Sequence, residues 1–297
     1  MTAISKKACV LIAAAICLSL VLGQAALAAE TTEYAGTAGY LDMGMDARII
    51  AMGGASVALP GSATSVNYNP AALGGMKGSE LASSYAQDYG MLQEGAVALR
   101  LGPLAVGALY AGASGIPEND EYGNKIGEFD YKALAAMAGC GLKLGPLAVG
   151  AQATYAQDTL GSIEGSGLTA SAGAQLQLGV LRLGAAGYRL IGAMTYGDKE
   201  QAFSPRYVAG AAIVTKVLTL TGECEIDADQ NKLLRGGGEL SLGSIALRGG
   251  AKYDMAEEEM TLSMGAGLNL GGAQVDYAYV MPANMPITHR ISIGLTF

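Results

Sequence analysis

Apolar and polar side chains alternate along most of this chain, and glycine interrupts the alternation at short intervals. The pattern is clearest around Gly243: Leu240 and Leu242 alternate with small or polar residues before it, and Ile245 and Leu247 resume the alternation after it. A period of two residues is typical of a β-strand with one apolar face. Because glycine supplies the positive φ angle that a tight turn needs, this stretch predicts a β-hairpin.

The same hairpin pattern recurs along the chain at irregular intervals. Its other turns are predicted at Gly102, Gly145, Gly179 and Gly271, and a degenerate copy has Lys216 in the glycine position. Each interval holds two strands of about ten residues and a loop, which is the length of a tilted strand that crosses a membrane. The irregular intervals favour a repeated hairpin over a solenoid of fixed period.

The charged residues of these hairpins all lie on the face opposite to the leucines and valines. This polar face carries Glu94, Arg100, Lys143, Arg182, Glu223, Glu225, Arg235, Glu239, Arg248, Lys252 and Asp276, and the last strand adds Arg290. A sheet with one apolar and one polar face has its apolar face against either a protein core or lipid. Further features of the chain decide between these two alternatives.

The N-terminus has the features of a secretory signal peptide. Lys6 and Lys7 precede an apolar run over residues 8–22, and a small-x-small cleavage site follows at residues 26–28. The run is too short, and wrongly flanked, for a membrane-spanning helix. Residues 1–28 are therefore predicted to be removed on export.

Composition favours a membrane barrel over a soluble sandwich. The chain is 51% hydrophobic but contains 44 Gly, 3 Phe and no Trp, which is poor material for the thick core of a soluble domain. The net charge of -8 argues against nucleic acid as a partner. Cys140 and Cys224 lie on the apolar face of separate strands, so we expect small lipid-facing residues and not a disulfide or metal pair.

Fourteen strands are predicted after Gly78, an even number, as bacterial barrels require. They lie near residues 79–87, 93–101, 104–113, 129–144, 147–157, 167–178, 181–191, 206–215, 218–227, 233–242, 245–254, 259–270, 273–281 and 287–297. The glycine turns are short, as periplasmic turns are, and longer polar links such as 114–127 and 193–205 lie on the other side. The predicted fold is all-β: a closed fourteen-stranded antiparallel transmembrane β-barrel over residues 79–297, with the charged face toward its lumen.

The last strand has an outward face of its own. Ile291, Ile293, Leu295 and Phe297 alternate with polar or small residues up to the C-terminus. A last strand that ends in an aromatic residue resembles the signal read by the outer-membrane barrel-insertion machinery. This machinery and outer-membrane lipid are therefore expected partners, and Phe297 is the expected assembly signal.

Residues 29–78 do not alternate and are predicted to contain no strand. The segment is rich in Gly, Ala, Ser and Asn, but it is too apolar for a disordered tail. Its residues 44–58 and 69–71 resemble the N-terminal signature of PorV/PorQ-type outer-membrane proteins, which belong with the FadL-like fatty-acid transporters. The residues of this motif are Arg48, Gly53, Gly54, Asn67, Asn69, Pro70 and Ala71.

The resemblance implies a fold and a role for this segment. FadL-like barrels have fourteen strands and an N-terminal hatch inside the lumen, so residues 29–78 are expected to form a hatch. Asn69-Pro70 is also a rigid turn signal on its own, because proline fixes φ. One departure is that residues 59–62 stand where the family often has an acidic pair.

Catalytic and cofactor chemistry is not expected. The single His289 lies on the outward face near the end of the last strand, and Ser83 on the first strand is a candidate neighbour in a closed barrel. Barrel phospholipases use such a pair, but no third orienting group is evident, so a plain interfacial histidine is favoured. No metal-ligand spacing and no phosphate-binding loop is present.

Two functions remain open. The resemblance to FadL-like proteins implies passive transport of small hydrophobic compounds across the outer membrane of a Gram-negative bacterium. The alternative, implied by the PorV-type members, is a non-transporting barrel that serves secretion or surface attachment of exported proteins. The lumen charges likewise have two interpretations, namely ion pairs that seat the hatch, which we favour, or a lining that sets permeant selectivity.

Overall fold

The computed structural model describes residues 38–88 and 90–297. The predicted signal peptide at residues 1–28 and the start of the predicted hatch segment lie outside the described residues. No helix among the described residues is long and apolar enough to cross a membrane.

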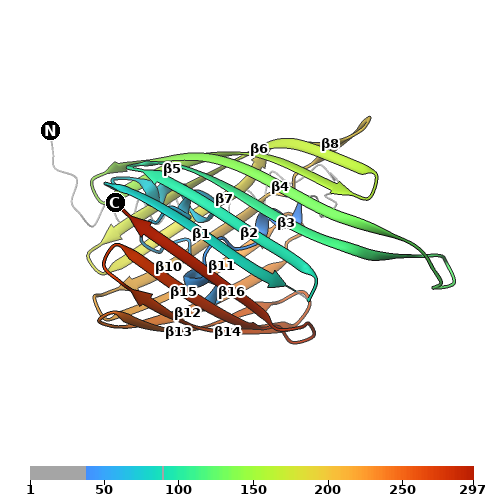
Figure 1. Cartoon of the computed structure of the whole chain (residues 1–297). Helices are drawn as coiled ribbons and strands as arrows, with labels where there is room; N and C mark the ends of the chain where they lie inside the picture. The colour runs from blue at the N-terminus through green and yellow to red at the C-terminus, as the bar shows by residue number, and fades with distance from the viewer. Residues whose placement is uncertain (1–37, 89) are drawn as a thin grey trace.

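Sixteen strands in the described residues form one antiparallel sheet. They are β1 (Ser79–Asp88), β2 (Leu92–Leu101), β3 (Leu104–Asn119), β4 (Lys125–Leu144), β5 (Leu147–Leu160), β6 (Ile163–Leu178), β7 (Leu181–Ile191), β8 (Ala193–Tyr196), β9 (Lys199–Ala202), β10 (Arg206–Val214), β11 (Leu218–Asp227), β12 (Lys232–Leu242), β13 (Ile245–Asp254), β14 (Glu259–Asn269), β15 (Ala273–Met281) and β16 (Thr288–Thr296). β1 pairs with both β2 and β16, and β10 pairs with β7, so the sheet closes on itself. Fourteen strands form the wall, and the predicted closed barrel is confirmed (Figure 1).

The two remaining strands correct the sequence prediction, which has a polar loop over residues 193–205. β8 and β9 form a hairpin there, and β8 adds to the end of β6, with Gly165 opposite Tyr196. The chain leaves the wall because Arg189 and Gly192 have φ angles of 53° and 102°, and the β6–β7 register shifts beside them. The alternation of side chains does not reveal such a shift.

β3 and β4 also extend beyond their predicted ends. Past Ala113 and Tyr131 they pair only with each other, and together they form an arm that projects beyond the neighbouring strands (Figure 1). Most of the predicted polar link over residues 114–127 is therefore strand.

Side chains alternate across the wall. Leu247 is 51% exposed on the outside, whereas the next residue, Arg248, is 7% exposed on the inside. The outside is covered with exposed leucine, isoleucine, valine and tyrosine, a surface suited to lipid and far too apolar for water. Cys140 and Cys224 are free, and Cys140 is exposed on this apolar face.

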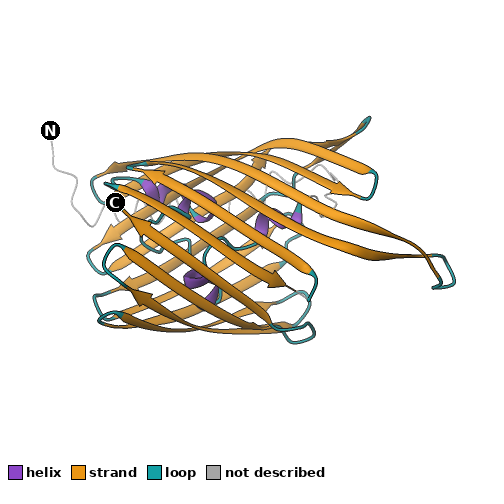
Figure 2. Cartoon of the chain, viewed as in Figure 1, coloured by secondary structure: helices purple, strands orange, loops and turns teal. Residues whose placement is uncertain are grey.

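The hatch lies inside the barrel (Figure 2). It contains η2 (Gly39–Asp42), α2 (Ala47–Ala51), α3 (Ser65–Tyr68) and η3 (Pro70–Leu73). Side-chain hydrogen bonds cap the N-termini of two of these short helices. The Asp46 carboxylate accepts from the Arg48 N–H at the start of α2, and Asn69 caps η3, whose first residue is proline. Met52, Val66 and Leu73 of the hatch are fully buried.

Glycines on the inner face of the wall let the hatch backbone approach. An added Cβ at any of eight such positions would come closer than 3.0 Å to hatch atoms. They are Gly141 and Gly150 beneath η3, Gly173 beneath Asn69, Gly184 and Gly210 beneath Val57, Gly237 and Gly250 beneath Met52 and Gly53, and Gly265 beneath Ala51. Because these glycines come from eight strands, the wall accepts the hatch on both sides of the lumen.

The assignment of the lipid face and the lumen face can be tested by placing arginine at two neighbouring positions of β14. Leu262→Arg places a charge on the lipid face, where it costs about 2–4 kcal/mol near the bilayer midplane and less toward the surface, so we expect poor assembly. Thr261→Arg points into a water-accessible cavity and should assemble. The heat-modifiable band of the folded barrel on an unboiled gel reports assembly. Equal assembly of both variants would refute the assignment of faces.

The glycine contacts can be tested by filling one of them. In Gly150→Val the side chain would overlap the backbone of Pro70 and Ala71, so we expect a displaced hatch and a marked rise in single-channel conductance in planar bilayers. Gly294→Val is the matched control, because no atom lies within 4 Å of an added Cβ there. A Gly150→Val barrel as closed as the wild type would show that the hatch does not depend on this contact.

Candidate functional site in the barrel lumen

One group of buried ion pairs joins α2 to the wall strands β12, β13 and β15. The Arg48 guanidinium donates two hydrogen bonds to Glu239, at 2.7 and 2.8 Å. Glu239 also accepts from Arg248 at 2.6 Å, and Arg248 donates to Asp276 at 2.7 Å. Burial lowers the pKa of Arg48, but the hydrogen bonds and charge of Glu239 outweigh this and raise it overall. Arg48 is therefore a permanent cation held by a carboxylate of the wall.

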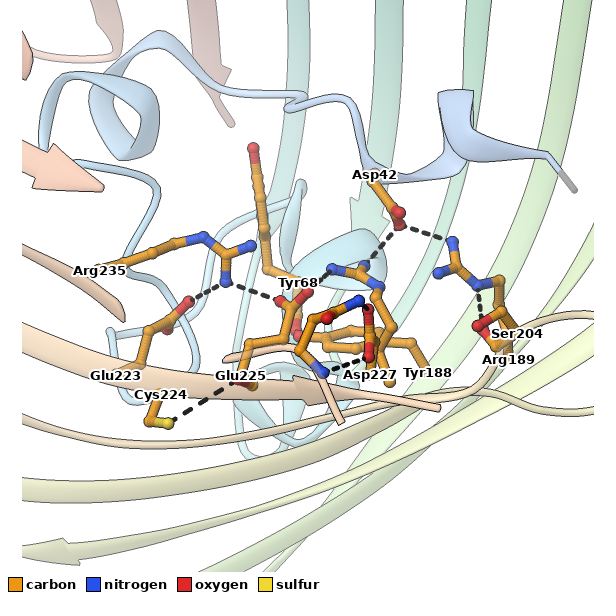
Figure 3. A network of polar contacts seen from close by, with 12 residues as sticks. Asp42, Tyr68, Tyr188, Arg189, Ser204, Glu223, Cys224, Glu225, Asp227 and Arg235 are labelled. Atoms are coloured by element: carbon orange, nitrogen blue, oxygen red, sulfur yellow. Dashed lines mark hydrogen bonds and ion pairs between the residues drawn. The ribbon is translucent and has the colours of Figure 1, made fainter. Parts of the chain in front are cut away.

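A second group joins η2 to the wall strands β7 and β10 (Figure 3). Asp42 accepts from Arg189 at 2.6 Å and lies at the same distance from a guanidinium nitrogen of Arg206. Arg206 also donates to Glu225 at 2.7 Å and lies over the ring of Tyr188. A single hatch carboxylate is thus fixed between two arginines of β7 and β10.

A buried wall carboxylate holds the hatch loop that follows α2. Glu223 accepts from the backbone N–H groups of Ser56 and Val57, at 2.7 and 2.8 Å. Its other oxygen accepts from Arg235 at 3.0 Å, and Arg235 also donates to Glu225 at 2.8 Å (Figure 3). Hydrogen bonds of this kind, to a charged acceptor, are the strong ones in a folded protein.

Arg290 and Arg100 fix two further points of the hatch. Arg290 donates to the Gly44 carbonyl and pairs with Glu94. Arg100 donates to the carbonyls of Lys77 and Gly78, where the hatch passes into β1, and pairs with Glu80 at 3.3 Å.

The remaining predicted lumen residues make no ion pair among the described residues. Lys143 lies beside Gly75 at the end of the hatch, and Arg182 is half-buried near the short turn that precedes β7. Lys252 lines a cavity above the hatch. At the C-terminus, the Phe297 side chain is 73% exposed, and its backbone pairs with Ser79 across the closing strands.

Asn69 of the Asn-Pro-Ala motif makes buried polar contacts within the hatch. The Asn69 side chain is buried, donates to the Val57 carbonyl at 2.7 Å and accepts from the Ala71 N–H at 3.1 Å. It therefore ties two distant parts of the hatch together directly above Gly173. Asn67 instead lines the cavity, and Gly53 and Gly54 have φ angles of 73° and 82°, which favour glycine.

The cavity lies between the hatch and the side of the barrel that carries the longer links, and its volume is about 200 Å³. Its lining mixes charged and hydroxyl groups with the apolar surfaces of Leu41, Ile50, Met137, Val208 and Val280. A second cavity of about 140 Å³ lies near the turn between β14 and β15. The hatch separates the two.

The hatch segment at Gly44 and Met45 forms part of the partition between the cavities. Gly44 lines the first cavity, and the next residue, Met45, lines the second. The Met45 N–H donates to the Tyr68 hydroxyl at 2.7 Å, which holds the partition in place. Burial raises the pKa of Tyr68, so this hydroxyl stays neutral.

Some residues that make these contacts are not among the residues predicted from the sequence. Asp42 is one of the two aspartates in the largely apolar residues 29–78, and a carboxylate in such a segment is a signal for a buried ion pair. Tyr188 breaks the outward alternation because it points inward and donates to the Tyr68 carbonyl (Figure 3). No sequence signal marks the backbone N–H groups of Ser56 and Val57.

The structure gives His289 a structural partner. Its Nδ1 lies 2.6 Å from the Tyr277 hydroxyl, and its ring lies edge-on to Tyr279. Ser83 is opposite Ile293, four residues along β16 from His289, so the two side chains are not neighbours. In the described part of the chain, no group of three or more acidic, cysteine or histidine side chains could hold a metal ion.

Comparison with known proteins places the fold. No family model matches the chain, and no curated protein matches it in sequence. The structure is similar to the toluene transporter TbuX of Ralstonia pickettii, with 14% identity and a TM-score of 0.61 over 86% of this chain and 98% of that one. It is also similar to the monoaromatic hydrocarbon channel CymD, with 13% identity and a TM-score of 0.64 over 86% of this chain and 98% of that one. A third similar structure is the toluene transporter TodX of Pseudomonas putida, with 11% identity and a TM-score of 0.62 over 85% of this chain and 98% of that one. The chain thus shares the barrel fold of FadL-like hydrocarbon transporters.

The ion pairs predict a specific weakness of the hatch. Glu239→Gln removes the carboxylate to which both Arg48 and Arg248 donate. Removal of one partner of a buried ion pair lowers the free energy of unfolding by about 3–5 kcal/mol. We expect trypsin to cleave the purified barrel after Arg48, a site that the wild type protects. The control Glu128→Gln removes an exposed pair with Lys125, which contributes about 0–1 kcal/mol, and should leave Arg48 protected. Equal protection of Arg48 in both variants would contradict this role of Glu239.

Proposed function

We propose that this protein is a passive channel for small hydrophobic compounds in the outer membrane of a Gram-negative bacterium. The observation that carries the proposal is a partly apolar cavity between a seated hatch and the wall of a barrel that has the fold of outer-membrane hydrocarbon transporters. The apolar outer face of the wall and the predicted signal peptide support the location.

The cavity limits the size of the permeant. Sites for drug-sized ligands are about 300–1,000 Å³, whereas this cavity has about 200 Å³. A single aromatic ring or a short aliphatic compound fits such a space. Passage requires the partition at Gly44 and Met45 to move, because it closes the route to the second cavity.

Uptake of radiolabelled toluene tests this proposal. Cells of a Gram-negative host without hydrocarbon channels should take it up faster when they express the protein. Thr261→Trp fills part of the cavity and should lower the rate toward that of the empty host, whereas Thr215→Trp, at an exposed turn outside the cavity, should not. An assembled wild-type barrel with no more uptake than the empty host would overturn the proposal.

A second candidate is surface attachment of exported proteins, in line with the PorV/PorQ-like motif. The observation that favours it is the β3–β4 arm, which projects from the barrel and carries an 81% exposed Tyr122 at its tip. Replacing residues 114–130 with a short turn tests it. Under the channel function, toluene uptake is unchanged; under the attachment function, exported proteins leave the cell surface of the native organism for the medium.

A further inference from the structure

A groove on the outer face of the wall combines apolar and polar side chains. It lies where β1 and β16 close the barrel, and its volume is about 440 Å³. Tyr85, Tyr277 and Ile291 line it and are exposed. Gln87 and His289 line it as well and are also exposed. Because these side chains point away from the lumen, the groove opens on the membrane side of the wall.

The register of the strands arranges these residues in two rows across the wall. In one row Gln87 is opposite His289, and in the next row Tyr85 is opposite Ile291. Tyr277 of β15 continues the second row, again opposite Ile291. The polar row is nearer the end of the barrel that carries the longer links, and the apolar row lies deeper along the strands. A lipid leaflet has the same order, with polar headgroups outside the acyl chains.

His289 is oriented by a hydrogen bond within the groove. Its Nδ1 lies 2.6 Å from the Tyr277 hydroxyl. With this hydroxyl as the donor, the imidazole carries its proton on Nε2. Within the residues that the structure describes, Nε2 has no hydrogen-bond partner, and the Gln87 amide makes one hydrogen bond, to the Gly90 carbonyl at 3.1 Å. The polar row thus offers an imidazole N–H and most of an amide to a ligand.

The groove offers a ligand no formal charge of a lysine, an arginine or an acid. Arg290 is the one such residue among its described lining residues, but the Arg290 guanidinium is buried on the inner side, where it pairs with Glu94 and donates to the Gly44 carbonyl. A zwitterionic headgroup placed here would have an ammonium without a charged partner, which is unfavourable. Sugar hydroxyls are neutral, donate and accept hydrogen bonds, and suit imidazole and amide groups. The C–H faces of sugars also pack on tyrosine rings.

We infer that this groove binds the acylated disaccharide of lipopolysaccharide, with a sugar against Gln87 and His289 and an acyl chain along Tyr85 and Ile291. The groove is continuous with the apolar outer face of the wall, so a lipid reaches it from within the membrane. It lies on the side of the longer links, which is the predicted exterior side, where the membrane lipid is a glycolipid. The inference goes beyond the channel function and does not depend on it, because the groove and the lumen cavities lie on opposite faces of the wall.

Native mass spectrometry of the barrel, purified in a neutral detergent and titrated with lipid A, tests this site. Lipid A is the acylated disaccharide itself, and phosphatidylethanolamine supplies acyl chains without a sugar. The wild type should bind lipid A at least about tenfold more tightly than phosphatidylethanolamine. The variant His289→Phe/Gln87→Leu keeps an aromatic ring but loses both polar groups, so it should bind lipid A at least about tenfold more weakly than the wild type.

Gln157→Leu is the matched control, because Gln157 is exposed on the outer face of β5 and outside the groove. It should leave the affinity for lipid A unchanged. The heat-modifiable band shows whether each variant assembles. Gln87→Leu alone leaves the bond between Tyr277 and His289 intact and replaces the double variant if that variant does not assemble; we then expect lipid A to bind several-fold more weakly.

Two results would overturn the inference. Equal affinity of the wild type for lipid A and phosphatidylethanolamine would refute a sugar headgroup, and unchanged affinity for lipid A in the assembled variants would refute the groove as its site. Toluene uptake distinguishes these failures from failure of the channel function. A barrel that takes up toluene and shows either result keeps the channel function and loses only the glycolipid site.

Discussion

Backbone-to-backbone contact between the hatch and the inner glycines is the constraint on which the rest of this structure depends. The lumen of a fourteen-stranded barrel is wider than one that wall side chains fill by themselves. A separate segment must therefore fill it, and at positions such as Gly141, Gly150 and Gly250 that segment lies where a Cβ would be. The high glycine content of the chain, which is poor material for a soluble core, is in this way the condition for a closely fitted hatch.

Close contact alone does not fix the orientation of the hatch, and the ion pairs supply that. Arg48 is held by Glu239 of β12, and Asp42 by Arg189 and Arg206 of β7 and β10. Desolvation offsets much of the attraction in such buried pairs, but leaving one partner unpaired costs several kcal/mol. The pairs thus disfavour a rotated or shifted hatch more than they add to total stability.

The barrel could be predicted from the sequence because its strands are encoded locally. Alternation with a period of two and glycine turns at positions such as Gly243 define strands and their faces within a few residues. The inward placement of Glu239 and Arg248 follows from the same alternation. Their partners do not, because Arg48 and Glu239 lie 191 residues apart and nothing in a short window links them. The β8–β9 hairpin was missed for a related reason, since it depends on a register shift beside Arg189 and not on composition.

Hydrogen exchange of the purified wild-type barrel, followed peptide by peptide, tests the central claim most directly. Protection reports the free energy of local opening. If the hatch is seated by the wall glycines and by ion pairs to β7, β10 and β12, the amides of residues 46–73 will exchange as slowly as those of the wall strands. Exchange of residues 46–73 as fast as that of the exposed tip of the β3–β4 arm, in a barrel whose wall is protected, would contradict the account.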